Sequence, residues 1–480
     1  MTKLAFELDA GDKRPLYVQI ADAIVGKIER GELNPNDRLP PMRALAADLG
    51  CALITVSQAY DALGARGRVT SRVGKGTYVA GARERAPAVE RRWEPEIGST
   101  TRARMEGVME QLARATTPET VSLASGNPAP KTFPLTEFGR CVQRTLLEDP
   151  PESMQYSPGS GDADLRAALA RGLRSRGVAA DAADIIVCSG AQQAAGIVAA
   201  TLLEPRAVVA AESPSYAPTL SVFDACGVTY VELEADAGGL RVDDVERVFA
   251  EYRPRLLYVN PFAQNPTGGV LSERRARQIV ALARRYDAVI LEDQTGWVFT
   301  YDGAPPAPLA AYDVDGRVVT IESLSKSIFP ALRIGYLYAK GGLQAPLEAS
   351  KIRADSFTST LVQRALWRFI VSPAYNRHLR TTRALYRARR DAFVERLAAV
   401  LPWADVPLPS AGLSLWLRLP ARLSTAAAFD ECAREGVLVM PADAWYPTRS
   451  GPAALRLSFG DLEEAQAAEG ISRLGRALAR

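Results

Sequence analysis

The sequence is poor in the residues that common catalytic and metal sites require. Its 480 residues include one histidine, His378, which has Arg377 and Arg380 close by. The five cysteines form no CxxC pair and have no histidine cluster beside them. A histidine-based triad, a zinc site and a disulfide framework are therefore not expected. We predict only a surface role for His378.

Long apolar runs and a strong charge imbalance are absent as well. No apolar stretch approaches the ~20 residues that cross a bilayer, and the N-terminus lacks the apolar core of a signal peptide. We therefore predict a cytoplasmic protein without a membrane partner. The net charge is only +3, so any binding of nucleic acid must depend on local clusters of basic residues. At about 150 residues per domain, the length predicts about two to four domains.

The first 80 residues show three helical patterns and then a hairpin. Apolar residues recur every four positions from Leu16 to Ile28, which predicts a first helix. The ranges 42–49 and 53–66 predict two more helices, each followed by glycine. Residues 68–80 alternate around Gly74-Lys75-Gly76, as in a β-hairpin. Two short helices and a hairpin are the plan of a winged helix-turn-helix.

The same segment resembles the GntR-type DNA-binding domain. The matching stretches are PLYVQIADAIVGKIERGELNPNDRLPPMRALAADLG, TVSQAYDALGARG and SRVGKGTYV. Side chains that can reach groove edges or neutralise phosphates are Thr55, Ser57, Gln58, Arg38, Arg43 and Lys75. Ala52 and Leu53 stand where that family often has a capping serine and a basic residue, so one direct DNA contact is expected to be missing. A helical subdomain with solvated arginines is the alternative.

Composition and motifs divide the chain into three parts. We predict a DNA-binding domain at 1–81, a polar and charged linker at 82–118, and a cofactor domain at 119–480 whose small C-terminal subdomain begins at about 375. In the third part, apolar β-branched runs alternate with helical patterns. This alternation predicts an α/β fold with a mainly parallel buried sheet. No G-x-G-x-x-G follows the first strand, so nicotinamide binding has little support.

Polar motifs follow the predicted strands of the third part. Ser189-Gly190-Ala191-Gln192 follows one apolar run, Asp293 ends another, and Lys326 lies in a serine-rich turn after 318–321. Asn265-Pro-Thr-Gly268 and Arg333 complete the set. Lys326 alone is ambiguous, since a solvated loop lysine fits as well. The ordered set resembles the fold-type I aminotransferases, which bind pyridoxal phosphate (PLP), over roughly residues 120–480.

The resemblance implies a role for each motif residue. Lys326 would form the Schiff base with PLP, and Asp293 would pair with the pyridine nitrogen. A strand-to-helix turn offers free N–H groups to a phosphate. The implied phosphate ligands are Gly190, Ala191, Gln192, Ser323, Ser325 and Arg333. Asn265 would donate to the phenolic oxygen and Tyr216 would stack on the ring.

Two further positions follow from the same resemblance. Thr295 stands where the family commonly has a tyrosine that bonds the phenolic oxygen, so we expect a less stabilised cofactor linkage, with a shifted pKa or altered catalytic competence. Arg456, on a predicted strand of the small subdomain, matches the arginine that clamps the substrate carboxylate, and a planar guanidinium suits that task. A solvent-facing arginine on an edge strand is the alternative.

A GntR-like domain joined to an aminotransferase-like domain is the architecture of the MocR/GabR regulators. The resemblance implies a PLP-dependent transcriptional regulator in which an amine or amino-acid effector acts through an aldimine on Lys326. It also implies a head-to-tail homodimer that binds double-stranded DNA with repeated half-sites. The alternatives are an active aminotransferase with an accessory DNA-binding domain, and a PLP sensor without an amine substrate. Turnover assays and absorbance scans with amines separate the three.

Overall fold

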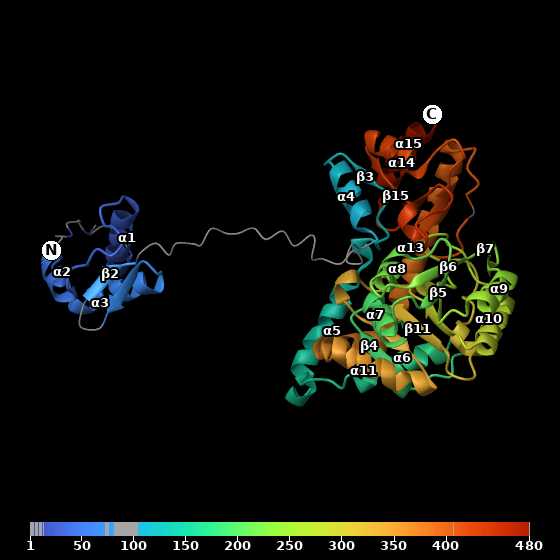
Figure 1. Ribbon diagram of the computed structural model, residues 1–480, viewed down its shortest axis with the longest axis horizontal. Helices are drawn as coiled ribbons and strands as arrows, with labels where there is room; N and C mark the ends of the chain where they lie inside the picture. The colour runs from blue at the N-terminus through green and yellow to red at the C-terminus, as the bar shows by residue number, and fades with distance from the viewer. Residues whose placement is uncertain are drawn as a thin grey trace. The chain divides into compact units, whose positions relative to one another are not determined.

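Figure 1 presents the computed structural model of the chain. The structure describes Leu4, Leu8, Asp12 and residues 14–72, 76–80, 104–406 and 408–479. The chain divides into two compact units, 1–97 and 98–480. Across the described residues, no helix is both long enough and apolar enough to cross a membrane.

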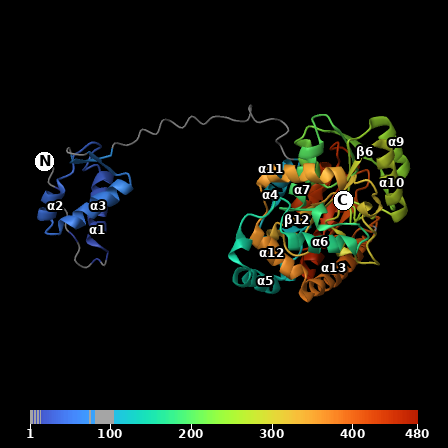
Figure 2. The same cartoon turned by 90° about the horizontal axis from the view of Figure 1, so that it is seen from below.

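The first unit is a small helical domain with a two-stranded wing. It contains α1 (Leu16–Glu29), α2 (Met42–Asp48), α3 (Leu53–Ala65), β1 (Val69–Arg72) and β2 (Gly76–Val79), and Figure 2 shows its helices grouped together. β1 and β2 pair antiparallel. Its core consists of fully buried side chains, among them Ile20, Ile24, Leu45, Val56 and Leu63. The predicted winged helix-turn-helix is thereby confirmed, although Lys75 lies outside the described residues.

A seven-stranded sheet forms the centre of the second unit. Its order is β4 (Ile185–Cys188), β12 (Gly335–Tyr338), β11 (Val318–Ser323), β10 (Val289–Asp293), β9 (Leu256–Val259), β5 (Val208–Glu212) and β6 (Thr229–Leu233). β12 runs antiparallel to both neighbours and the remaining pairs are parallel. Since strands covered on both faces need apolar side chains throughout, the apolar runs predicted this mainly parallel sheet correctly.

Helices cover both faces of this sheet. One face packs on α6 (Ala163–Arg174), α9 (Val242–Tyr252), α10 (Glu273–Tyr286) and α12 (Thr360–Ile370). The other packs on α7 (Ala191–Leu202), α8 (Ala217–Asp224) and α11 (Gln344–Asp355). In Figure 2, α7 and α11 lie on one side of β12 and α6 and α12 on the other. The strand ends between these layers therefore form the edge at which ligand sites of α/β proteins lie.

A smaller C-terminal part packs around its own three-stranded sheet. The long helix α13 (Pro373–Val400) leads to β13 (Ser414–Arg418), α14 (Thr425–Arg434), β14 (Val437–Leu438), β15 (Met440–Pro441), β16 (Ala454–Ser458) and α15 (Glu464–Leu478). The sheet order is β13-β16-β15, all antiparallel. The short strand β3 (Val121–Ser122) joins this part by pairing in parallel with β14. Residues 121–122 therefore belong to the small subdomain, although they lie far from the rest of it in the sequence.

Part of the range predicted as a linker is helical. α4 (Glu106–Ala115) lies within 82–118, and Leu112 is buried against the core of the small subdomain. Met105, Val108 and Ala115 pack on the same core. Their spacing of three and four residues is that of one helix face. The charged residues between them obscured this pattern in the sequence. The domain boundaries given above stay predictions.

Candidate functional site

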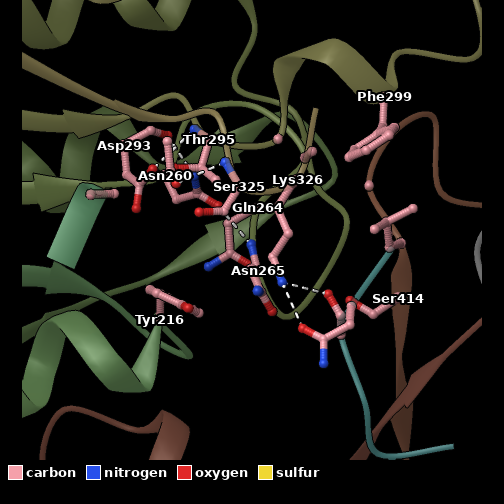
Figure 3. A pocket seen from close by; sticks show the side chains of 18 of the residues that line it. Tyr216, Asn260, Gln264, Asn265, Asp293, Thr295, Phe299, Ser325, Lys326 and Ser414 are labelled. Carbon is pink, nitrogen blue, oxygen red and sulfur yellow. Dashed lines mark hydrogen bonds between the residues drawn. The ribbon is translucent and has the colours of Figure 1, made fainter. Parts of the chain in front are cut away.

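A cavity of about 290 Å³ lies between the large sheet, the small sheet and the segment 126–127. Apart from Gly190, all predicted cofactor and effector residues line it: Tyr216, Ala191, Gln192, Asn265, Asp293, Thr295, Ser323, Ser325, Lys326, Arg333 and Arg456. In Figure 3, Asp293, Thr295 and Asn260 gather on one side of Lys326, and Phe299 and Ser414 lie on the other. The structure thus brings together predicted residues that are up to 265 positions apart in the chain, from Ala191 to Arg456.

Lys326 projects into this cavity from the turn that follows β11. Its Nζ donates to the Gly126 carbonyl oxygen at 2.9 Å and to Asn127 Oδ1 at 3.1 Å. Burial, and then the nearby positive charge of Arg456, lower the pKa of Lys326 to about 8. A larger fraction of the amine is therefore neutral near physiological pH than for an exposed lysine, and the neutral amine is the nucleophilic form.

One end of the cavity is built to hold an anion. Gly190 precedes α7 with φ of 106°, and a Cβ there would lie 3.1 Å from Arg333 Nη2. Arg333 itself has φ of 49°, and its Nη2 donates to the Ser189 carbonyl oxygen at 2.9 Å. The guanidinium is thereby held beside the first N–H groups of α7. A helix N-terminus with an adjacent arginine suits a phosphate group.

A chain of hydrogen bonds behind this end fixes its backbone. The Ser189 N–H donates to Gln193 Oε1 at 2.7 Å, and Gln193 Nε2 donates to Asp355 Oδ2 at 2.7 Å. Asp355 also accepts a hydrogen bond from Nζ of Lys351, whose side chain has no exposed surface. The buried ion pair therefore anchors the turn that carries Gly190.

Asp293 occupies the opposite end, at the close of β10. Its Oδ1 accepts the Thr295 N–H at 3.0 Å and its Oδ2 accepts the Tyr258 hydroxyl at 3.4 Å. Burial raises the pKa of Asp293 because no cation compensates its charge. Nearby, Thr295 Oγ1 is buried and has no hydrogen-bond partner among the described residues. A protonated ring nitrogen would supply the missing positive partner of the carboxylate.

Asn260 connects this end to the rest of the site. Its Nδ2 donates to the Asp293 carbonyl oxygen at 2.5 Å, and its Oδ1 accepts the Asn265 N–H at 2.7 Å. The Asn260 N–H in turn donates to Glu212 Oε2 at 2.9 Å, and burial raises the pKa of Glu212 to about 8. One amide thus positions both Asp293 and Asn265. Asn260 was not predicted as a site residue, although an asparagine directly after a buried strand was a usable signal.

Arg456 reaches the cavity from the middle of β16. Its Nη2 donates to the Ala124 carbonyl oxygen at 2.7 Å, and its guanidinium lies 4.7 Å from the centre of the Trp445 ring. The side chain is buried, its Nε has no partner among the described residues, and burial lowers the pKa of Arg456 to about 10. A buried cation without a carboxylate partner fits an anionic ligand. Arg456 is therefore not a solvent-facing arginine on an edge strand, which was the alternative, since β16 lies between β13 and β15.

Two hydrogen bonds of Lys326 were not predicted from the sequence. Gly126 and Asn127 precede Lys326 by 200 and 199 positions, and no local pattern marks them.

The predicted surface role of His378 is wrong. Its ring is half-buried under the lysine turn, with Nε2 2.7 Å from the Ser327 carbonyl oxygen, because α13 packs beneath that turn.

All the predicted DNA-contacting residues except Lys75 lie in the described part of the first unit, and each is at least partly exposed. Arg38, Arg43 and Gln58 are exposed, while Thr55 and Ser57 are half-buried on α3. Arg38 lies against the wing, since a Cβ on Gly76 would meet its Nε at 2.8 Å. This arrangement leaves the arginines available to phosphates.

The cavity as a whole matches the chemical groups of PLP. It offers an anion cradle, a buried carboxylate, an amine of lowered pKa and a tyrosine, Tyr216, in its wall. Among the described residues there is no cluster of histidine, cysteine, aspartate and glutamate side chains that could hold a metal ion.

Comparison with known proteins gives two family matches. Residues 118–474 match "Aminotransferase class I and II", and residues 16–79 match "Bacterial regulatory proteins, gntR family". The chain is 30% identical over 377 residues to aromatic-amino-acid aminotransferase 1 of Thermococcus litoralis, covering 76% of this chain and 90% of that one. It is 29% identical over 473 residues to the "Probable rhizopine catabolism regulatory protein MocR" of Rhizobium meliloti, covering 97% and 94%. The solved structure of Pyrococcus horikoshii kynurenine aminotransferase with PMP has a TM-score of 0.77 at 28% identity, over 80% of this chain and 97% of that one.

Proposed function

The chain belongs to the aminotransferase class I and II family and carries a gntR-family DNA-binding domain ahead of it, and on this premise we propose that its DNA binding responds to an amino acid bound beside PLP. As a MocR-like protein it is a PLP-dependent DNA-binding regulator. The observation that carries the proposal is the pairing of the half-buried Lys326 with the buried Arg456 in one cavity, each bonded to the same short segment.

Residues of this chain would hold the cofactor at three points. Lys326 would bind it covalently, Asp293 would face its ring nitrogen, and Arg333 with the first turn of α7 would hold its phosphate. When bound, PLP supplies an aldehyde that condenses with amines and a ring that withdraws electrons. The Thr295 hydroxyl, which has no partner in the described part of the chain, is available as a donor within this cradle.

Arg456 supports an amino acid as the effector class. Within the described part of the chain its Nε has no hydrogen-bond partner, and its Nη1 donates to Asn265 Oδ1 at 3.4 Å. A carboxylate would compensate the buried charge, while the effector amine would meet the cofactor near Lys326. Both requirements are satisfied by an α-amino acid.

The same contacts let bound ligands act on the segment 121–127. Ala124 and Gly126 accept hydrogen bonds from Arg456 and Lys326. A bound carboxylate and a covalently occupied Nζ would compete for those donors. The segment 121–127 would then change its partners, and an effector moves an equilibrium only through such differential contacts.

A homodimer fits the surface of the second unit. Tyr156 is 80% exposed, its ring centre lies 4.8 Å from that of Phe357, and Ile352 is 48% exposed. Leu146 and Leu147, at the end of α5 (Leu135–Glu148), are exposed too. Exposed apolar groups of this kind mark interfaces. We infer a head-to-tail dimer, whose two DNA-binding domains read repeated half-sites.

The test uses the full chain loaded with PLP. Promoter fragments bound by the wild type are identified by genome-wide mapping, and their binding is then measured with and without a panel of amino acids. Lys326→Ala should lose the visible absorbance of the bound cofactor and the response, while still binding DNA. Arg456→Met should keep the absorbance but lose the response to amino acids. An unchanged response in Arg456→Met contradicts the proposed carboxylate site.

An active aminotransferase is the second candidate. It is favoured by the joint presence of Lys326, Asp293 and Arg456 around one cavity and by 30% identity to proteins named as aminotransferases. Steady-state turnover with amino donors and a keto acid decides between the two. Rates of about 1 to 1000 per second, typical of metabolic enzymes, would favour this candidate.

A further inference from the structure

Two apolar side chains at the start of α3 are exposed to solvent. Leu53 is 46% exposed and Ile54 is 65% exposed. Every other apolar side chain larger than alanine on this helix, namely Val56, Tyr60 and Leu63, is buried in the core of the domain. Within the described part of the domain, neither Leu53 nor Ile54 packs on that core. Their apolar surface is therefore not used for folding.

The exposed pair shares a helix face with polar side chains predicted to contact DNA. At about 100° per residue, Leu53, Ile54, Ser57 and Gln58 fall within about 140° of arc. The buried residues Val56 and Leu63 lie on the opposite side of α3. In helix-turn-helix domains the N-terminal residues of the second helix of the motif contact base edges in the major groove. α3 has this place, since it follows α2 across a turn at Gly50.

The side chains of leucine and isoleucine carry no hydrogen-bond donor or acceptor. They cannot read the pattern of polar groups on a base pair, and an unmatched polar edge placed against them would be penalised. The apolar group that an unmodified base presents in the major groove is the C5-methyl of thymine. Since this chain is a DNA-binding regulator, we propose that Leu53 and Ile54 read thymines in each half-site through their methyl groups.

The expected size of the effect follows from the area of one methyl group. Burial of one such carbon changes an equilibrium by about fourfold. Two methyl contacts, one for each side chain, would give about fifteenfold per half-site. Contacts of the exposed Arg38 and Arg43 with phosphates would add affinity without base preference.

The experiment uses the full-length protein loaded with PLP and a duplex selected from a random-sequence pool by the wild type. Each thymine is replaced in turn by deoxyuridine, which removes only the methyl group. We expect about fourfold weaker binding at one or two positions per half-site, and no such loss in Leu53→Ala/Ile54→Ala. Placing a C·G pair at a sensitive position should weaken binding, and 5-methylcytosine there should recover about fourfold in the wild type alone.

Two control variants sharpen the result. Leu16→Ala removes a leucine that is 45% exposed at the start of α1, and it should leave both affinity and methyl dependence unchanged. Gln58→Ala should weaken binding but keep the methyl dependence. The proposal is overturned if no thymine is sensitive, or if the double alanine variant keeps the wild-type sensitivity. Failure of the wild type to select any duplex would instead contradict the DNA-binding function itself.

Discussion

Replacing Asp355 by asparagine is expected to destabilise the protein by about 3 kcal/mol, because it leaves a buried ammonium group unpaired. Lys351 has no exposed side-chain surface, and Asp355 is 24% exposed. Removing one partner of a buried pair costs about 3–5 kcal/mol. The lower end applies here, since the asparagine oxygen can still accept one hydrogen bond.

Urea unfolding of the cofactor-free protein, at one protein concentration, measures this loss. Lys351→Met/Asp355→Asn removes both charges and should recover at least half of it, because an apolar replacement of similar volume costs less than about 1.5 kcal/mol. Glu110→Gln, which breaks the exposed pair of Glu110 with Arg114, is the matched control and should cost about 0.5 kcal/mol or less.

A second measurement follows the same pair to the cavity. Asp355 holds Gln193, which holds the Ser189 N–H beside the anion cradle. Asp355→Asn should therefore lower the affinity for PLP more than the affinity for pyridoxal, which lacks the phosphate. The reasoning is refuted if the loss of stability is below about 1 kcal/mol, the value of a surface pair, or if both ligands weaken equally.

Three other outcomes are expected. Arg333→Met should weaken PLP by about tenfold to a hundredfold in equilibrium titration and leave pyridoxal almost unchanged, since a hydrogen bond to a charged group is worth about 1.5–3 kcal/mol. Loading of PLP on Lys326, followed by visible absorbance, should speed up about tenfold per pH unit below pH 8 and level off above it; a rate still rising beyond pH 9 would contradict the lowered pKa of about 8. Trp445→Leu should weaken carboxylate effectors by about 1–2 kcal/mol in calorimetry, because the buried guanidinium of Arg456 loses its aromatic partner. An equal loss for amines without a carboxylate would instead indicate general damage to the cavity.

The parts of the fold that the sequence predicted well are those in which local pattern and burial agree. The apolar run before Ser323 is β11, and the helical stripe through Ile20 and Ile24 is α1. The ends of strands and helices differ from the predicted ends by one or two residues, because the last turn of a helix and the last pair of a strand depend on neighbouring segments. α4 was missed, since Leu112 is its one fully packed residue and charged residues surround it.

Within the site, residues on strand ends were predictable and residues from crossing segments were not. Asp293 ends the buried strand β10 and Lys326 lies in the turn just after the buried strand β11, which marks them in the sequence. Gly126 reaches the cavity, and Trp445 reaches the Arg456 guanidinium, through the packing of β3 on β14 and the folding of the small subdomain around β16. Such contacts depend on tertiary packing, so spacing along the chain carries no trace of them.

The short stretch from Ala124 to Gly126 is held at two backbone carbonyl groups. Arg456 Nη2 donates to the Ala124 oxygen and Lys326 Nζ donates to the Gly126 oxygen. Each of these two donors would also have to bind a ligand. On the proposed function, a bound cofactor would take one of these donors away from the stretch, and an effector carboxylate would take the other. The stretch would lose both hydrogen bonds only when cofactor and effector are bound together, so the proposed response of DNA binding would require both ligands.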